Sequence, residues 1–277
     1  MRKITIILIA LFFTYFAHSQ TINDAVRYSL YDIAGTARTV GAGGALGALG
    51  ADFSVLSTNP AGLATYRRSE FMFTPTVNLS NVKAELEGSQ NQSVEQTKTK
   101  FNLNNLGLVI ANRPYESKWK TSNFAVGLNR MANFHQEIFY EGTSSGSITD
   151  RFLELAVGKS LSELGNFEEG LAYDAFAIFD DNGQYFSDFL LGEDVEKSQR
   201  IERVGSVNEL VFSLAGNYNE KLMLGATVGI PFIRFEETKT YREIDEDDST
   251  PVFDELAYTE NLNTTGAGIN LKIGAIY

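Results

Sequence analysis

The strongest constraint on the fold is a two-residue alternation that recurs in six segments of the chain. In each segment apolar side chains occupy alternate positions, which is typical of a β-strand with two different faces. In the second segment the doubled Asn104-Asn105 shifts the alternation by one residue, which indicates a β-bulge. Only residues 219–221 separate the fourth and fifth segments, which predicts a tight hairpin. The segments are 70–80, 101–111, 124–134, 208–218, 222–235 and 266–277.

The face opposite the apolar one decides which kind of all-β protein to expect. Soluble sheets tend to carry Lys and Glu on their polar face, whereas here that face is mostly Gly, Ala, Asn, Ser and Thr. Small polar residues suit a lumen that another part of the chain fills. The segments also have about the 9–11 residues that a tilted strand needs to cross a bilayer. We therefore predict an all-β chain that forms a transmembrane antiparallel β-barrel, and the patterns alone leave a soluble β-sandwich open.

Residues 1–19 read as a secretory signal peptide. Arg2 and Lys3 precede an apolar run, and Ala17-His18-Ser19 is a small-x-small cleavage site. An uncleaved membrane anchor is the alternative, although the run is short for a spanning helix. Cleavage leaves 21 basic and 35 acidic residues, a net charge of −14, which argues against nucleic acid as a partner. We therefore predict export to the bacterial outer membrane.

Residues 40–50 consist almost entirely of Gly and Ala, and an Asn59-Pro60 turn follows them. A dinucleotide fingerprint would need a third glycine where Leu46 stands, and no Gly-Lys-Ser/Thr element follows for a nucleotide loop. Small residues let backbone pack against backbone, and the short polar side chains at 52–59 hydrogen-bond to nearby backbone. We therefore expect this leader to be a compact plug enclosed by a wall.

The stretch 51–64, which reads ADFSVLSTNPAGLA, resembles the signature of the FadL-type outer-membrane transporters of long-chain fatty acids and aromatic hydrocarbons. The resemblance implies an N-terminal hatch over residues 20–67, seated in a fourteen-stranded barrel. Because six strands cannot enclose a hatch, we expect residues 68–277 to be an incomplete barrel, a fragment lacking the C-terminal strands. The hatch motif consists of Asp52, Ser54, Asn59, Pro60, Ala61 and Gly62.

The same resemblance implies passive uptake of hydrophobic small molecules, driven by burial of alkyl chain and followed by lateral release into the membrane. The expected protein is a monomer among outer-membrane lipids and lipopolysaccharide, without cofactor or metal. The alternative is a surface-exposed structural or adhesive β-barrel protein whose loops bind a partner. An enzyme is not expected, because the mature chain has one histidine, His135, and no cysteine or nucleophile elbow. The acidic group 243–248 lacks a Ca²⁺-loop pattern and is expected to be a solvated outer loop.

The third strand breaks its own alternation at Arg130, which shares the apolar parity of Phe124 and Leu128. A cation on the lipid face costs about 2–4 kcal/mol at mid-depth. We therefore expect a kink or bulge that turns Arg130 inward, toward a carboxylate or the hatch, and the resemblance implies that such a kink is a lateral opening. The alternative is that Arg130 snorkels at the membrane interface. The residues assigned to the opening are Asn129, Arg130, Met131 and Asn133.

The segment 137–207 is predicted to be a long outer loop that contains helices. Apolar residues recur there at helical intervals after Thr149, a candidate helix N-cap. Long loops on one side and short turns on the other are typical of outer-membrane barrels. These apolar faces are expected to capture ligand, or to pack on each other and cap the barrel, and the two roles are compatible. The capture residues are Phe152, Leu155, Leu161, Leu164, Phe167, Leu171, Phe176 and Phe179.

Overall fold

The computed structural model describes residues 22–88, 92–189, 194–245 and 253–277, so the expected signal peptide, 1–19, lies outside the described residues. One antiparallel sheet dominates the fold, which confirms the prediction of an all-β antiparallel chain. Its strands are β1 (Glu70–Ala84), β2 (Val94–Asn112), β3 (Trp119–Asn133), β4 (Gln136–Ser145), β7 (Asp194–Tyr218), β8 (Leu222–Ile244), β9 (Glu255–Ala267) and β10 (Asn270–Ile276).

The remaining elements are short. The helices are α2 (Ile22–Ser29), α3 (Ala37–Gly41), α4 (Ile148–Ala156) and α5 (Glu169–Asp174), with 3₁₀ turns η2 (Phe53–Ser57), η3 (Pro60–Thr65) and η4 (Leu161–Glu163). A separate hairpin joins β5 (Phe179–Asp181) to β6 (Gln184–Phe186). No described helix is both long and apolar enough to cross a membrane.

The sheet is a wall of six long strands, in the order β1-β2-β3-β7-β8-β10. β4 continues β3 along β7, and β9 precedes β10 along β8, so each of these two wall strands is one broken strand. The six alternating segments of the sequence fall in six different wall strands, as predicted. Within the described residues the wall does not close, because β1 pairs only with β2, while β9 and β10 pair only with β8.

Two local predictions are confirmed by the strand register. The pairing of β1 with β2 steps from Thr74–Asn105 to Pro75–Leu103, which leaves Asn104 as the extra residue of a β-bulge. The hairpin between β7 and β8 turns through residues 219–221, and Asn219 has a left-handed φ of 54°, a conformation that asparagine tolerates better than most residues.

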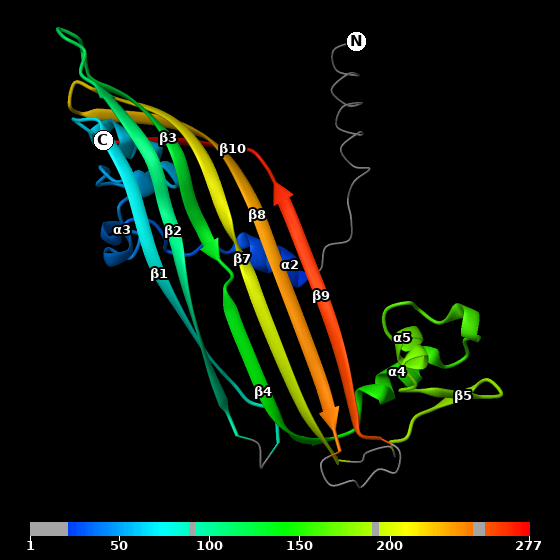
Figure 1. Cartoon of the computed structure of the whole chain (residues 1–277). Helices are drawn as coiled ribbons and strands as arrows, with labels where there is room; N and C mark the ends of the chain where they lie inside the picture. Colours follow the sequence, from blue (N-terminus) through cyan, green and yellow to red (C-terminus); the bar gives the residue numbers. More distant parts are fainter. Residues whose placement is uncertain (1–21, 89–91, 190–193, 246–252) are drawn as a thin grey trace, which may run out of the picture.

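The strands are longer than the alternation predicted. β7 has 25 residues and β8 has 23, and both ends of the expected loop 137–207 belong to strands, namely β4 and the start of β7. Along these extensions the outward positions carry charged and polar residues such as Glu202, Arg234 and Glu236, so the apolar alternation fades although the ladder continues. Figure 1 shows the long strands running side by side, with α4 and α5 beyond their far end.

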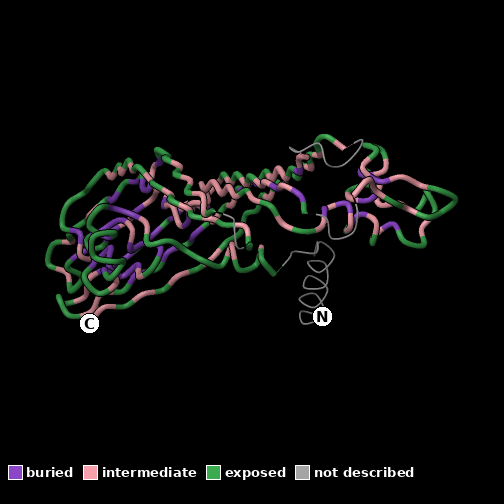
Figure 2. The backbone as a smooth tube through the Cα atoms, turned by 90° about the horizontal axis from the view of Figure 1, so that it is seen from below, coloured by how far each residue is buried: buried purple, intermediate pink, exposed green. Residues whose placement is uncertain are grey.

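The wall curls at one end and flattens toward the other. Figure 2 shows buried residues gathered inside the curled end, while a ribbon of strands leads away to a second group of buried residues. The first group contains residues 36–66, here called the inner segment, which packs on the concave face of the wall through Phe53, Leu56 and Leu63. Wall residues of this core are Val109, Ala125, Val211 and Ala215.

Paired glycines of the wall make the room that the inner segment occupies. Gly107 of β2 lies opposite Gly127 of β3, and the ring of Phe53 covers both. A Cβ on Gly127 would lie 2.6 Å from the ring atom Cζ, and one on Gly107 would overlap the ring. Gly225 and Gly274 form a second pair, across β8 and β10, where a Cβ would overlap residues 59–61.

We predict that Gly107→Ala destabilises the protein by about 1–3 kcal/mol, because an added methyl would overlap the Phe53 ring and displace it. The measurement is equilibrium urea unfolding in detergent, followed by the fluorescence of Trp119, the single tryptophan of the chain. Gly266→Ala is the matched control, since a Cβ there meets nothing within 4 Å. Equal unfolding midpoints for the two variants would contradict the packing of Phe53 on the wall glycines.

Candidate functional site

The motif Asp52-x-Ser54 closes a turn of the inner segment with its own side chains. The Asp52 carboxylate caps η2 by accepting from the Ser54 N–H at 2.9 Å, and it also accepts from the Thr36 hydroxyl. The Ser54 hydroxyl in turn accepts from the Thr36 N–H at 3.1 Å. Asp52 is buried, so these hydrogen bonds replace the ones that water would otherwise make to its carboxylate.

Asn59-Pro60-Ala61-Gly62 starts the second 3₁₀ turn in the same way. The Asn59 side chain accepts from the Ala61 N–H at 3.2 Å and donates to the Gly47 carbonyl at 2.7 Å. Pro60 occupies the first turn, where its missing N–H costs nothing. Gly62 lies directly against Gly50, so the leader packs backbone to backbone at this point. Residues 41–45, 48 and 49 are exposed, and a Cβ on Gly41 or Gly43 would meet nothing within 4 Å, so the expectation that residues 40–50 are enclosed is wrong for most of that stretch.

Asparagine and threonine side chains of the wall hold the inner segment in place. Asn123 donates to the carbonyls of Leu63 at 2.8 Å and Tyr66 at 2.9 Å. The Thr121 hydroxyl donates to the Ala64 carbonyl at 2.6 Å. This arrangement explains the small polar face of the strands, because these side chains satisfy backbone groups that the wall would otherwise bury without partners.

Asn105 and Asn129 mark the point where β2 and β3 part. They are the last paired residues of the two strands. The Asn105 side chain donates to the side-chain oxygen Oδ1 of Asn129 at 2.6 Å, and the Asn129 side chain donates to the Ser57 hydroxyl at 2.8 Å. Beyond them the register of β3 on β7 skips Met131. The expected bulge between Asn129 and Asn133 is therefore confirmed, and it leaves a split between the lower part of β2 and the continuation of β3.

Arg130 reaches across this split. Its Nε donates to the Leu103 carbonyl at 3.2 Å and its Nη1 to the Asn102 side chain at 3.1 Å. We expected a carboxylate or the hatch as its inward partner, whereas Leu103 and Asn102 both lie on β2. Asn102 is drawn into range by the bulge at Asn104, a contact that the alternation along one strand does not reveal.

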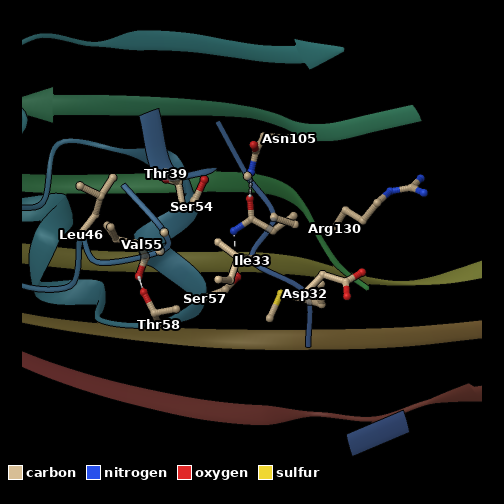
Figure 3. Close-up of a pocket in the computed structure, with 16 residues that line it drawn as sticks. Asp32, Ile33, Thr39, Leu46, Ser54, Val55, Ser57, Thr58, Asn105 and Arg130 are labelled. Carbon is tan, nitrogen blue, oxygen red and sulfur yellow. Dashed lines mark hydrogen bonds between the residues drawn. The ribbon is translucent and has the colours of Figure 1, made fainter. Parts of the chain in front are cut away.

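A pocket of about 300 Å³ lies between the inner segment and the split. Apolar side chains from three places line it, among them Ile33, Leu46 and Val55, together with Met131. Figure 3 shows Arg130 and Asp32 at the same end of the pocket, on the two sides of the bend in β3. The site therefore combines an apolar chamber with one cation and one carboxylate at its edge.

The outward face of the curled end is apolar and exposed. On β8 the exposed stretch from Leu224 to Phe232 spans about 27 Å at about 3.4 Å per residue. Neighbouring strands continue it into one belt, far larger than the few hundred Å² of apolar patch usual on a soluble monomer. The belt also contains Phe71, Phe73, Val77, Leu79, Phe101, Leu106, Leu108, Ile110, Phe212, Leu214, Leu271 and Ile273.

The helical outer region differs from the sequence prediction in its cap. Ser147, not Thr149, is the N-cap of α4, and its side chain accepts from the Thr149 N–H. Glu243, which we expected in a solvated loop, is fully buried at the end of β8 and accepts from the Ile148 N–H at 2.8 Å. The prediction for Glu243 was wrong because this partner lies 95 residues away in sequence. Residues 246–248 of that acidic group lie outside the described residues.

The predicted capture residues fall into two groups. Phe152 is buried in the core of the outer region with Leu164 packed against it, and Phe179 stacks on Phe186. Leu155 is half-buried. Leu161, Leu171, Phe167 and Phe176 are exposed, the last two to 82% and 75%.

An open cavity of about 550 Å³ lies between α5 and the edge strand β9. Its lining includes Phe152, Leu171 and Phe176 from the outer region, and Phe253 and Tyr258 from the strand side. The outer region therefore packs on itself and also presents an open hollow, whose lining mixes apolar side chains with polar ones such as Asp254 and Thr259.

No protein-family model, curated protein or solved structure matches the chain. The site is therefore interpreted from its own geometry. Sequence reasoning missed residues 32–35 at the pocket and the glycine pairs under the inner segment, since neither has a local pattern; only the doubled asparagine hinted at the split.

The outer region carries a pH-dependent ion pair. Lys159 donates to Glu169 at 2.7 Å and the Gly165 N–H donates to it at 2.6 Å, which lowers the pKa of Glu169 from 4.5 to about 2. A carboxylate with a lowered pKa stabilises the fold fully above its unfolded pKa and loses that contribution as the pH falls toward the folded value. We predict that the stability difference between wild type and Glu169→Gln is largest above about pH 5.

The same difference should shrink between about pH 4.5 and 2 and vanish below that range. Urea-dependent proteolysis of the outer region across pH, with an acid-stable protease, measures it. Glu154→Gln, a change at an exposed position of α4, is the control. A difference between wild type and Glu169→Gln that does not vary with pH would contradict the ion pair.

Proposed function

We propose that this protein mediates uptake of hydrophobic molecules, long-chain fatty acids or hydrocarbons, across the bacterial outer membrane. One observation carries the proposal: a single curved wall turns an apolar belt outward and seats an inner segment on its concave side through glycines and asparagines. The belt suits lipid, and the concave face suits a hatch. The resemblance of residues 51–64 to FadL-type transporters supports the same assignment.

The proposed membrane position follows from the belt. Its length of about 27 Å along β8 corresponds to a height of about 19–22 Å at the strand tilt of about 35–45° found in outer-membrane barrels, whose apolar band is about 25 Å tall. The outward charged residues of β7 and β8 would then lie beyond the membrane. Because unpaired strand edges are not tolerated in lipid, we propose that further strands complete the wall between β10 and β1.

The proposed route of the ligand has two binding positions and a lateral exit. An apolar molecule first binds in the outer hollow beside α5, then enters the pocket beside the inner segment, and leaves sideways through the split between β2 and β3. Burial of alkyl chain drives each step at about 0.8 kcal/mol per CH₂. No step requires an energy source, so transport is passive.

Arg130 favours an anionic amphiphile over a neutral hydrocarbon. Its guanidinium spends Nε and one Nη1 contact on β2, while a guanidinium has five N–H donors in all. Arg130 lines the pocket at the end where Asp32 also lies. We propose that the remaining donors of Arg130 hold a carboxylate head group there while its tail fills the chamber.

We predict that Arg130→Ala weakens binding of a fluorescent fatty acid to the detergent-purified protein about tenfold or more, since a hydrogen bond to a charged group is worth about 1.5–3 kcal/mol. Binding of the matching fatty alcohol should change little. Arg234→Ala, at an exposed position on β8 where the arginine pairs with Glu236, is the control. Equal loss for acid and alcohol would contradict the role of Arg130.

A surface-exposed structural or adhesive protein is the second candidate. The observation that favours it is the exposure of Phe167 and Phe176 on the outer region, which a partner protein could cover. Cells that carry the protein but lack their own fatty-acid transporter separate the two functions. Uptake of the fluorescent fatty acid supports transport, whereas protein that needs no detergent, or shows no uptake despite correct membrane assembly, would refute it.

A further inference from the structure

The end of the wall that carries the short turns is basic, although the protein as a whole is acidic. This turn end consists of residues 67–70, 113–120 and 219–221. Figure 1 shows it beside the C-terminus, at the opposite end of the wall from α4 and α5. It contains six basic and three acidic residues, a net charge of +3, whereas the whole chain has a net charge of −12. The turn end is therefore a positive patch on a negative protein.

Three of the basic side chains at the turn end line one cleft of about 370 Å³. They are Arg67, Arg113 and Lys120, and Glu220 is the one carboxylate among the described residues of the lining. Within the part of the chain that the structure describes, these three cations form no ion pair. Every arginine of β7 and β8, by contrast, pairs with a glutamate. The cleft therefore keeps a net charge of +2 that no protein group neutralises.

We propose that this cleft is a binding site for a phosphate monoester. Such a group carries a charge of about −1.5 to −2 at pH 7, which matches the charge of the cleft, whereas a fatty-acid carboxylate carries −1. The planar guanidinium groups of two arginines also fit phosphate oxygens bidentately. None of the described lining residues also lines the pocket beside the inner segment or the outer hollow. The inference therefore goes beyond the proposed transport and does not depend on it.

A single buried asparagine of the wall brings the two arginines of the cleft together. The Asn123 side chain donates to the Tyr66 carbonyl at 2.9 Å, which fixes the chain immediately before Arg67. Its oxygen accepts from the Asn112 N–H at 3.2 Å, which fixes the end of β2 immediately before Arg113. Because Asn123 is only 1% exposed, both arginines emerge from a rigid base rather than from free loops.

Lys120 reaches the cleft because it is the extra residue of a β-bulge. β3 pairs with β7 at Trp119–Tyr218 and then at Thr121–Asn217, so the register skips Lys120. In a regular strand Lys120 would face away from Thr121, toward the apolar belt. Bulges at sheet rims re-aim side chains, and here Lys120 and Thr121 line the same cleft. The Thr121 hydroxyl also donates to a carbonyl of the inner segment at 2.6 Å, which holds the bulge in place.

The test is calorimetric titration of the full chain, in a non-ionic detergent, with sn-glycerol 3-phosphate. Glycerol, which lacks the phosphate, is the ligand control. The phosphate ester should bind at one site per chain, and glycerol should not bind. Arg67→Gln combined with Arg113→Gln and Lys120→Gln should weaken binding at least tenfold, because a hydrogen bond to a charged group contributes about tenfold or more.

The matched control removes the same amount of charge from the same end of the wall. Arg68→Gln combined with Lys118→Gln and Lys221→Gln changes three exposed residues that do not line the cleft, and it should keep the affinity within about threefold. The urea midpoint of each variant verifies that it is folded. Equal loss in the two triple variants, or no binding by the wild-type protein, would overturn the proposed site.

A second arm identifies the source of the phosphate. Bound sn-glycerol 3-phosphate is challenged with phosphatidic acid or with phosphatidylcholine in the same micelles. Displacement by phosphatidic acid alone assigns the cleft to a lipid head group, and displacement by neither lipid assigns it to a soluble ester. Displacement by phosphatidylcholine as well would overturn the specificity for a monoester. The cleft variant should bind fluorescent fatty acid like the wild type, so failure of this site and failure of the proposed function are separate results.

Discussion

The seat of the inner segment on the concave face is the contact on which the rest of the structure depends. The tip of the Phe53 ring lies against Gly107 and Gly127, and a Cβ on Gly107 would overlap the ring. A curved sheet with an apolar outer face also needs its inner face covered, because backbone and side-chain polar groups there would otherwise lack partners. The glycines of the wall make room for the inner segment, and Gly50 and Gly62 let that segment pack closely on itself.

The two bulges of the wall lie next to the inner segment and shape the space beside it. The extra residue at Asn104 and the skipped Met131 let β2 and β3 part just beyond the last wall asparagines that hold the segment. A regular ladder would have continued past this point and left neither pocket nor split. Arg130 and residues 32–35 then bridge the parted strands.

Much of this arrangement was predictable from local patterns. The alternation located six wall strands, the doubled asparagine located a bulge, and the break at Arg130 located a second one, because periodicity and parity are properties of neighbouring residues. The strand extensions were missed since their outward residues are polar, and the cap of α4 was assigned to Thr149 because helical spacing cannot distinguish it from Ser147. Local patterns also cannot predict that a helix distant in sequence buries a carboxylate, as α4 does with Glu243.

The sequence by itself therefore determined the antiparallel strands, their two faces and the compact leader with its self-capping Asp52 and Asn59. Only the tertiary structure decided that Arg130 reaches β2, that Asp32 accepts from the Asn133 N–H beyond the last pair of β2 and β3, and that Glu243 accepts from the first turn of α4. The physical reason is separation along the chain: Asp32 and Asn133 are 101 residues apart, and Ile148 and Glu243 are 95 apart. Steric and hydrogen-bonding preferences act between neighbours, whereas these contacts exist only after the wall has curved and brought distant segments together.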